Sequence, residues 1–436
     1  MPTAWLSWPA KWPRLFRRVS DARRMTSIRS YALVTGAYWG FTITDGALRM
    51  LVVLHFYRLG YNPVSIAFLF LFYEFFGIVT NLFGGWIASR SGVKATLFGG
   101  LALQIFALLM LAALNERWPI AVSVVYVMIA QALSGIAKDL TKMSSKSAIK
   151  VVVPEGQQGA LFKWVARLTG SKNALKGLGF FVGGALLGAF GFAGALTGMA
   201  AALLVVLLAT AATLSGDLGR SKKKVKFTSL LSKSPAINWL SSARLFLFAS
   251  RDAWFVVGLP VFLSQLGWTS WSVGAFLAIW VIGYGIVQAA VPEILRALGN
   301  RSVDGSEAAR WAFGLAVIPA GLALALHSGM DRSLVLMLGL AVFALVFAVN
   351  SAIHSYLVLA YTDEDSVALN VGFYYMANAG GRLLGTLASG IVFQIAGFTA
   401  CLWCSTAMVL AAAFLSLPLT KGRAVSLESA GAGEGE

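Results

Sequence analysis

The chain has few of the residues on which soluble enzymes and disulfide-bonded proteins depend. Its 436 residues include only two cysteines, three histidines and 18 acidic residues, against 35 lysines and arginines. Two cysteines cannot build a disulfide framework. The sequence also has no phosphate-binding glycine loop, zinc-ligand spacing or nucleophile elbow. We therefore do not expect an enzyme, and we expect no cofactor and no bound metal.

Charged residues of either sign are scarce for a chain of this length. They make up 12% of the residues, while 58% are hydrophobic and the mean hydropathy is +0.76. Such values are typical of a polytopic α-helical membrane protein and not of a soluble core. The net charge of +17 would suggest nucleic acid as the partner of a soluble protein. Here we expect the lipid bilayer instead, and no nucleic acid.

Long apolar runs recur along the chain, and each is long enough to cross a bilayer. About twelve are expected, near residues 31–56, 63–89, 94–114, 119–140, 160–189, 192–214, 237–264, 270–295, 308–328, 332–360, 366–395 and 397–418. Basic residues concentrate in alternate joints, which the positive-inside rule places in the cytoplasm together with both termini.

One change of composition divides the chain. A basic, serine-rich segment at 215–236 reads as a cytoplasmic linker between two six-helix bundles, at 31–214 and 237–418. Residues 1–30 are expected to form a basic cytoplasmic tail, and residues 419–436 a second tail.

The two bundles carry matching residues at a nearly constant shift. A shift of 207 takes Asp45 to Asp252, and it takes Leu59-Gly60-Tyr61 to Leu266-Gly267-Trp268. The same shift relates Ser65 to Ser272 and Asn81 to Gln288, and a shift of 206 relates Lys176 to Arg382, Gly179 to Gly385, Gly184 to Gly390 and Gly191-Phe192 to Gly397-Phe398. Matched charges at matched depth indicate an internal duplication, which predicts two pseudo-symmetric halves.

Ionisable residues inside the spans are mostly basic. We count eight cations, Arg49, Lys138, Arg167, Lys172, Lys176, Arg244, Arg251 and Arg382, against four acids, Asp45, Glu74, Asp139 and Asp252. We expect local pairs of Asp45 with Arg49, Lys138 with Asp139 and Arg251 with Asp252. The cations left over favour a multiply anionic substrate, because an unpaired charge inside a membrane is costly. The alternative is that Arg167, Lys138 and Arg244 extend to the cytoplasmic surface. His354 is expected to be a hydrogen-bonded packing residue, with a proton relay as its alternative role.

Two patterns resemble the major facilitator superfamily. The third, sixth, ninth and twelfth spans carry almost no ionisable residue, as in the peripheral helices of that fold. The superfamily's loop between helices 2 and 3 is matched by Gly85-Trp86-Ile87-Ala88-Ser89-Arg90-Ser91-Gly92-Val93-Lys94. Gly85, Arg90, Gly92 and Lys94 retain its gating pattern, while Ser89 replaces the aspartate. The resemblance implies an all-α transporter fold of twelve helices.

Longer stretches resemble one branch of this superfamily, the ArsJ organoarsenical efflux permeases. They are Thr44–Phe56, Gln131–Lys150, Leu168–Gly177 and Ala243–Val257. The resemblance implies export of 1-arseno-3-phosphoglycerate across the bacterial inner membrane, which gives resistance to arsenate. It also implies a functional partner, glyceraldehyde-3-phosphate dehydrogenase, which makes this compound when it uses arsenate in place of phosphate.

Residue roles follow as hypotheses. Arg49 and Arg251 would hold one oxyanion, and Lys172, Lys176 and Arg382 the other, with Asn173, Tyr374 and Asn378 on the glyceryl portion. Asp45, Glu74 and Asp252 are candidates for coupling protonation, with fixed counter-ions as the alternative. Two other functions stay open: an exchanger of phosphorylated metabolites or organic anions, and a membrane sensor that does not transport.

Overall fold

The computed structural model describes residues 12–152, 158–214, 234–299, 302–328, 330–361, 367–421 and 425–426. The expected linker and the chain ends therefore lie largely outside the described residues. In the N-terminal half the helices are α1 (Trp12–Arg58), α2 (Pro63–Leu69), α3 (Leu71–Ala112), α4 (Ile120–Val152) and α5 (Gln158–Thr213). The C-terminal half contains α6 (Pro235–Phe255), α7 (Gly258–Gln265), α8 (Ser270–Ala289), α9 (Val291–Ala297), α10 (Gly305–Ala325), α11 (Arg332–Ala360), α12 (Val367–Ser416) and the 3₁₀ turn η3 (Leu417–Lys421).

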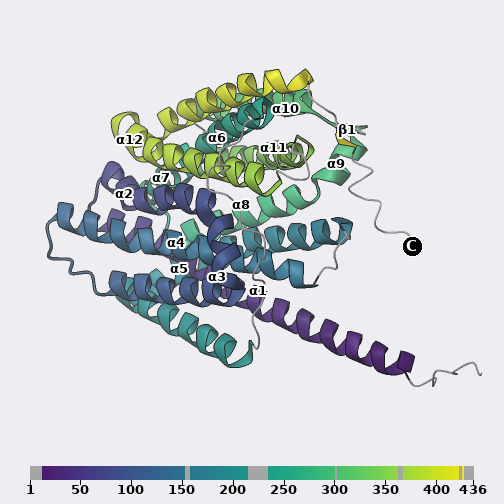
Figure 1. Ribbon diagram of the computed structural model, residues 1–436. Helices are drawn as coiled ribbons and strands as arrows, with labels where there is room; N and C mark the ends of the chain where they lie inside the picture. Colours follow the sequence, from purple (N-terminus) through teal and green to yellow (C-terminus); the bar gives the residue numbers. More distant parts are fainter. Residues whose placement is uncertain are drawn as a thin grey trace, which may run out of the picture.

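The fold is α-helical, as expected, apart from one very short strand pair. The strands β1 (Ser302–Val303) and β2 (Val425–Ser426) pair antiparallel, beside the start of α10. In Figure 1, α6, α10, α11 and α12 lie together on one side of the molecule and α1, α3, α4 and α5 on the other. Helices α2 and α8 lie between these two groups.

Membrane crossings agree in number with the expected twelve. Nine helical segments of the described chain are long and apolar enough to cross a membrane. Two of them, Ser171–Thr213 and Asn370–Leu419, are about twice the length that one crossing needs. Each is interrupted by a glycine with non-helical backbone, Gly191 or Gly397, and so makes two crossings. The charged α1 supplies the remaining one.

The duplication seen in the sequence is also present in the backbone. Within the described residues, positive φ angles occur only at glycines, and these form three pairs: Gly60 and Gly267 at 83° and 87°, Gly92 and Gly299 at 75° and 84°, and Gly191 and Gly397 at 67° and 74°. A side chain with a Cβ is strained in this conformation, so the sequence requires glycine there. The pairs are separated by 207, 207 and 206 residues, so both halves reverse direction at equivalent positions.

Helix caps repeat in the same way. Asn62 and Thr269 precede α2 and α8 with identical backbone angles, φ −70° and ψ 158°. Their side chains accept hydrogen bonds from the backbone N–H groups of Ser65 and Ser272, as N-cap residues do. The two halves are therefore two copies of one backbone, built from sequences that differ at most positions.

Within each half, glycines let two helices approach closely. A Cβ on Gly179 of α5 would lie 2.5 Å from the carbonyl oxygen of Ile43 on α1. A Cβ on its counterpart Gly385 of α12 would lie 2.5 Å from the carbonyl oxygen of Ala249 on α6. Both approaches place charged residues of α1 and α6 beside the charged residues of their partner helices.

The two halves meet through a second pair of glycines. A Cβ on Gly184 of α5 would lie 2.5 Å from the carbonyl oxygen of Ser270 on α8. A Cβ on Gly390 of α12 would lie 2.6 Å from the carbonyl oxygen of Pro63 on α2. Because Gly184 corresponds to Gly390 and Pro63 to Ser270, the seam between the halves is itself pseudo-symmetric.

A break in the seventh span follows the charged residues of α6. Helix α6 ends at Phe255 and α7 begins at Gly258, two residues before Pro260. Proline cannot donate a backbone hydrogen bond and crowds the preceding turn, which accounts for the break. The side chain of Ser389 on α12 accepts hydrogen bonds from the freed N–H groups of Val257 and Gly258, at 3.2 and 2.9 Å. The break therefore fixes α6 against α12 one turn from Asp252.

Candidate functional site

Charged side chains of both halves converge on Glu74, on α3. Its Oε1 atom accepts hydrogen bonds from Nη2 of Arg49 at 2.5 Å and from Nη2 of Arg382 at 2.6 Å. Arg49 comes from α1 of the same half, whereas Arg382 comes from α12 of the other half. The Glu74 side chain is 0% exposed, so this carboxylate depends on the two guanidinium groups for its charge balance.

Asp252, the counterpart of Asp45, is the carboxylate that the C-terminal half contributes. Its Oδ1 atom lies 2.6 Å from Nη2 of Arg251, and its Oδ2 atom lies 3.7 Å from Nε of Arg382. Arg382 thus bridges Glu74 and Asp252. We call Arg49, Glu74, Arg251, Asp252 and Arg382 the central charge network. It holds three guanidinium groups and two carboxylates.

The local pairs expected from the sequence form in only one case. Arg251 pairs with Asp252, as expected. Arg49 does not pair with Asp45, because Arg49 binds Glu74, and Asp45 instead accepts a hydrogen bond from the Tyr73 hydroxyl at 2.6 Å. The two arginines that we assigned to separate oxyanions, Arg49 and Arg382, share one oxygen atom.

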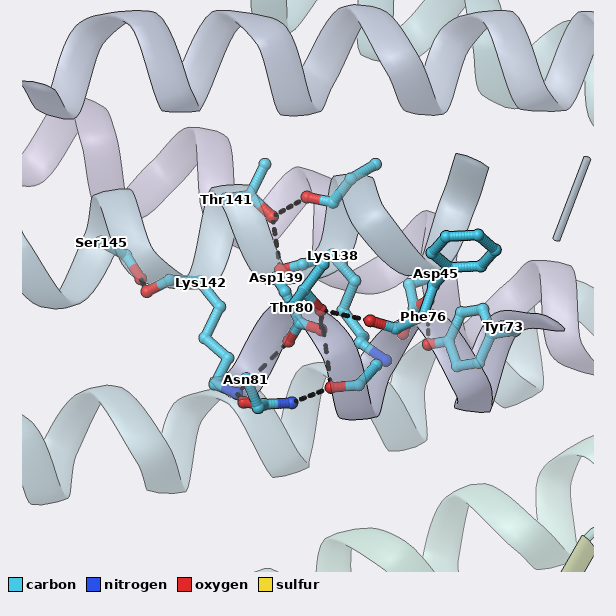
Figure 2. Close-up of polar contacts among 12 residues, drawn as sticks. Asp45, Tyr73, Phe76, Thr80, Asn81, Lys138, Asp139, Thr141, Lys142 and Ser145 are labelled. Carbon is cyan, nitrogen blue, oxygen red and sulfur yellow. Dashed lines mark hydrogen bonds and ion pairs between the residues drawn. The ribbon is translucent and has the colours of Figure 1, made fainter. Parts of the chain in front are cut away.

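A second polar cluster lies between α3 and α4. Asp139 accepts a hydrogen bond from Thr80 and lies 3.4 Å from Nζ of Lys142. Lys142 also donates to Oδ1 of Asn81 at 2.7 Å. Figure 2 shows these four side chains converging between the two helices. The expected pair of Lys138 with Asp139 does not form a close contact, because Lys142 is the lysine within 4 Å of that carboxylate, although Lys138 lies near enough to act on it electrostatically.

Two lysines near the central charge network have no carboxylate within 4 Å in the described chain. The ammonium group of Lys138 lies 4.0 Å from the centre of the Tyr73 ring. That of Lys176, on α5, lies 5.9 Å from the centre of the Phe180 ring. Lys172 and Asn173 occupy the preceding turn of α5. Lys138 does not extend to the cytoplasmic surface, which was the alternative for it, because the aromatic face of α3 holds it inside the bundle.

Arg244 was not among the residues expected to bind substrate. The alternative that it extends to the cytoplasmic surface does not hold, since it is 5% exposed. Nε donates to Oδ1 of Asn378 at 2.9 Å, and Nη1 donates to the carbonyl oxygen and the hydroxyl of Ser351 at 3.0 and 3.1 Å. One signal in the sequence indicates this position: Arg244, Phe248 and Arg251 follow helical spacing and share one face of α6.

The three neutral residues expected to contact substrate surround this arginine or connect to it. Asn378 binds its Nε, and the Tyr374 ring lies 5.1 Å from its guanidinium carbon. Asn173 on α5 donates to Gln288 on α8 at 3.3 Å, and Gln288 donates to Ser351 at 3.2 Å. A chain of hydrogen bonds therefore runs from Arg244 across the seam to the N-terminal half.

The expected gating loop is seen only in part. Gly92 supplies the positive φ angle that separates the second span from the third within α3. Lys94 follows, with its ammonium group 5.7 Å from the centre of the Phe98 ring. Gly85 and Arg90 lie in the helix before the break, and the Arg90 side chain is outside the described residues.

An apolar pocket of about 490 Å³ lies between α1 and the two arms of α5. Glycines and apolar side chains make up nearly all of its lining, which includes Val182, Phe190 and Leu203. None of its lining residues is charged. An anion would lose its hydration there without compensation, so the charged seam is the better candidate site.

Comparison with known proteins agrees with this architecture. A family model described as Major Facilitator Superfamily matches residues 30–349. A POT family transporter solved in complex with a thioalcohol-conjugated peptide has 14% sequence identity and a TM-score of 0.71, and the match covers 88% of this chain and 94% of that one. A POT family transporter solved with 5-aminolevulinic acid has 13% identity, the same TM-score and the same coverage. No curated protein matches the chain. With a family match over most of its length and a shared fold, the chain belongs to the Major Facilitator Superfamily and is a multi-pass membrane transporter, not an enzyme.

Proposed function

We propose that this transporter exports a small organic molecule carrying two oxyanion groups, and that this molecule is 1-arseno-3-phosphoglycerate. The observation that carries the proposal is the excess of cations along the seam. Arginines and lysines from α1, α4, α5, α6 and α12 lie there, with fewer carboxylates to balance them. The resemblance to ArsJ permeases names the substrate, which glyceraldehyde-3-phosphate dehydrogenase would supply from the cytoplasm.

Substrate and Glu74 would compete for the same guanidinium groups. Arg49 and Arg382 share a single oxygen of Glu74, whereas a phosphate or arsenate group offers each of them its own pair of oxygens. A bound oxyanion would therefore take Arg382 away from Glu74. That contact joins the halves, so losing it would allow the rocking motion that alternating access requires. Asp45, Glu74 and Asp252 remain our candidates for proton coupling.

The same site suits a second substrate class. A guanidinium group distinguishes phosphate from arsenate poorly, because both are tetrahedral oxyanions with similar hydrogen-bonding edges. An exchanger of phosphorylated metabolites for inorganic phosphate would therefore use the same residues. Arg49 and Arg251, on the equivalent first and seventh spans, would serve either substrate.

Uptake into everted membrane vesicles tests the proposal. Vesicles containing the protein, supplied with the dehydrogenase, NAD⁺ as oxidant, glyceraldehyde 3-phosphate and arsenate, are expected to accumulate organic arsenic. Arg49→Ala and Arg382→Ala are expected to lower the rate at least tenfold. Arg310→Gln, which removes an exposed cation on α10, serves as the control.

Two results would contradict the proposal. Accumulation equal to that of vesicles lacking the protein would exclude export of the arsenical. Rapid exchange of inorganic phosphate for phosphorylated metabolites, without arsenical uptake, would establish the second substrate class. Arsenate tolerance of a sensitive host that expresses the protein with the dehydrogenase gives an independent readout of the first.

A further inference from the structure

We infer that Arg244 forms a second anion-binding subsite, which takes the other oxyanion of a two-headed substrate. The subsite consists of Arg244, Ser351 and Asn378, with Ser241 and His354 at its cytoplasmic side. The inference rests on the proposed function and adds to it: the central charge network holds one oxyanion, and a separate cation holds the other. It replaces Lys172 and Lys176 as the main ligands of that second group.

The guanidinium group of Arg244 has an uncommitted edge. Nε and Nη1 make the three hydrogen bonds described above, whereas Nη2 donates to no described residue. The rings of Phe248 and Tyr374 lie 4.0 and 5.1 Å from the guanidinium carbon. Aromatic rings and neutral oxygen atoms thus fix the orientation of the Arg244 guanidinium group. Its free edge keeps the donors that a carboxylate, phosphate or arsenate oxygen would accept.

In the described chain, Arg244 makes no salt bridge to a carboxylate, although it is slightly more buried than Arg49, at 5% against 6% exposed. Arg49, Arg251 and Arg382 all have a carboxylate within 4 Å. Burying a charge without a counter-ion is expensive unless a ligand supplies one. Arg244 therefore has more to gain from an anion than any arginine of the central charge network.

Polar groups without hydrogen-bond partners lie one helical turn from Arg244 and from Ser351. Ser241 lies one turn before Arg244 on α6, toward the cytoplasm. His354 lies one turn after Ser351 on α11. Because α6 and α11 run antiparallel, with Arg251 over Phe347 and Arg244 on Ser351, these two turns lie at the same level. The Ser241 hydroxyl and both ring nitrogens of His354 are buried without a hydrogen-bond partner. The expectation of a hydrogen-bonded His354 is thus wrong, and the orphaned groups indicate a missing polar ligand.

The spacing of the two subsites suits a short molecule. Asn378, which binds Arg244, and Arg382, which binds Glu74, are one turn apart on α12, or about 6 Å along the helix axis. The Phe248 ring lies between Arg244 and Arg251, 4.0 and 4.8 Å from their guanidinium carbons. Two oxyanions joined by a three-carbon backbone can reach both arginine groups, whereas inorganic phosphate can reach only one.

Binding of one-headed and two-headed anions tests the subsite. The probes are glycerol 3-phosphate, with one phosphate, and 3-phosphoglycerate, with a phosphate and a carboxylate. Calorimetric titration of the purified full-length protein in lipid nanodiscs gives both dissociation constants. Arg244→Gln is expected to weaken 3-phosphoglycerate binding about tenfold or more, because one charge-assisted contact is lost. It is expected to change glycerol 3-phosphate binding less than about twofold.

Two further variants separate binding from folding. Asn378→Asp keeps the shape of the side chain and gives Arg244 an internal carboxylate, so the same selective loss is expected from a protein with its packing intact. Arg310→Gln removes an exposed cation of α10 and is expected to leave both constants unchanged. Arg49→Gln is expected to weaken both anions together, because it belongs to the other oxyanion site.

Each result has a defined meaning. If Arg244→Gln and Asn378→Asp weaken both probes equally, or neither, the subsite does not exist, while anion transport through the central charge network still stands. If the unaltered protein binds neither probe, both the subsite and the proposed function are contradicted. A selective loss of the two-headed probe in both variants establishes the subsite.

Discussion

At Glu74 one carboxylate oxygen accepts from two guanidinium groups, and these come from opposite halves of the molecule. The Glu74 side chain is fully buried, so water does not solvate its contacts with the two arginines. Breaking a buried ion pair by removing one partner costs far more than forming it gains, because the remaining charge stays in a medium of low dielectric. On the proposed mechanism, this contact favours the present arrangement of the halves when no anion is bound.

Replacing Glu74 tests this coupling. Glu74→Gln leaves Arg49 and Arg382 competing for one neutral amide, and we expect the ligand-free protein to lose about 3–5 kcal/mol of stability. The double variant Glu74→Gln with Arg382→Gln is expected to lose less than the sum of the two single variants, by at least about 1 kcal/mol. Thermal unfolding in detergent measures all four proteins. Additive losses would show that the two side chains do not interact.

At the scale of the helices, close approach depends on the absence of a side chain at a few glycines. Gly179 and Gly385 occupy equivalent positions, and each faces a carbonyl oxygen of the neighbouring helix. Gly188 lies on the same α5 helix with no atom within 4 Å of the position that a Cβ would take. The same residue type thus serves packing at one position of α5 and not at another.

Alanine substitutions separate these two kinds of glycine. Gly179→Ala and Gly385→Ala are expected to destabilise the protein by about 1–3 kcal/mol, because the helices must move apart. Gly188→Ala is expected to be neutral or to stabilise by up to about 1 kcal/mol, because alanine favours the helix. Melting temperatures in detergent provide the comparison. Equal effects at all three positions would contradict the packing argument.

The start of α10 depends on a charged cap outside the membrane spans. Asp304 accepts hydrogen bonds from the backbone N–H groups of Ser306 and Glu307, at 2.8 and 3.2 Å. Partial burial opposes ionisation of this carboxyl, but the hydrogen bonds from Ser306 and the two N–H groups outweigh it and lower its pKa. Its stabilising contribution is therefore complete above the unfolded pKa of about 3.9 and is lost as the pH falls through the lower folded value.

Hydrogen exchange in the first turn of α10 measures the cap. We expect protection of this turn to fall as the pH is lowered below about 4. Asp304→Ala is expected to reduce protection at neutral pH by the equivalent of about 1 kcal/mol. Asp304→Asn keeps a good cap without a titrating group, so its protection should not depend on pH in this range. A pH dependence that survives in Asp304→Asn would assign the effect to another residue.

At the scale of the whole molecule, the halves also join where α2 meets α12. The backbone N–H of Val64 donates to the side chain of Gln394 at 3.2 Å, close to the Gly390 contact. A second contact between the halves joins Arg58 on α1 to Ser270 on α8, at 2.5 Å. Alternating access requires these contacts to open in one part of the cycle.

A reversible cross-link tests this requirement. In a background with Cys401→Ala and Cys404→Ala, the pair Val64→Cys and Gln394→Cys is expected to form a disulfide on oxidation. Transport should then stop, because the halves cannot separate at that end, and a reducing agent should restore it. Val64→Cys alone is the control. Transport that continues at full rate in the cross-linked protein would show that this contact stays closed throughout the cycle.

Sequence alone was sufficient for the helices, the duplication and the superfamily, and not for the partners of the charges. The lengths of the apolar runs and the matched residues at a shift of 207 can be read from the sequence itself, without knowing which residues are in contact. The expected pair of Asp45 with Arg49 used helical spacing within α1, but Arg49 binds a carboxylate 25 residues away. Arg244 was left out of the candidate site because its partners, Ser351 and Asn378, lie more than 100 residues away along the chain. Tertiary packing decides such contacts, and no local pattern reports them.

A carrier for organic anions works among far more abundant chloride and bicarbonate ions, and it must not leak them. On the proposed mechanism, Glu74 binds Arg49 and Arg382 when no substrate is present. It is therefore an intramolecular competitor with a high effective concentration. A monovalent ion that makes one contact would rarely displace Glu74. A substrate that binds two arginine groups at once would displace it. The shared carboxylate would then make the carrier selective for anions with two charged groups. It would limit the leak of monovalent anions without a constriction in the pathway.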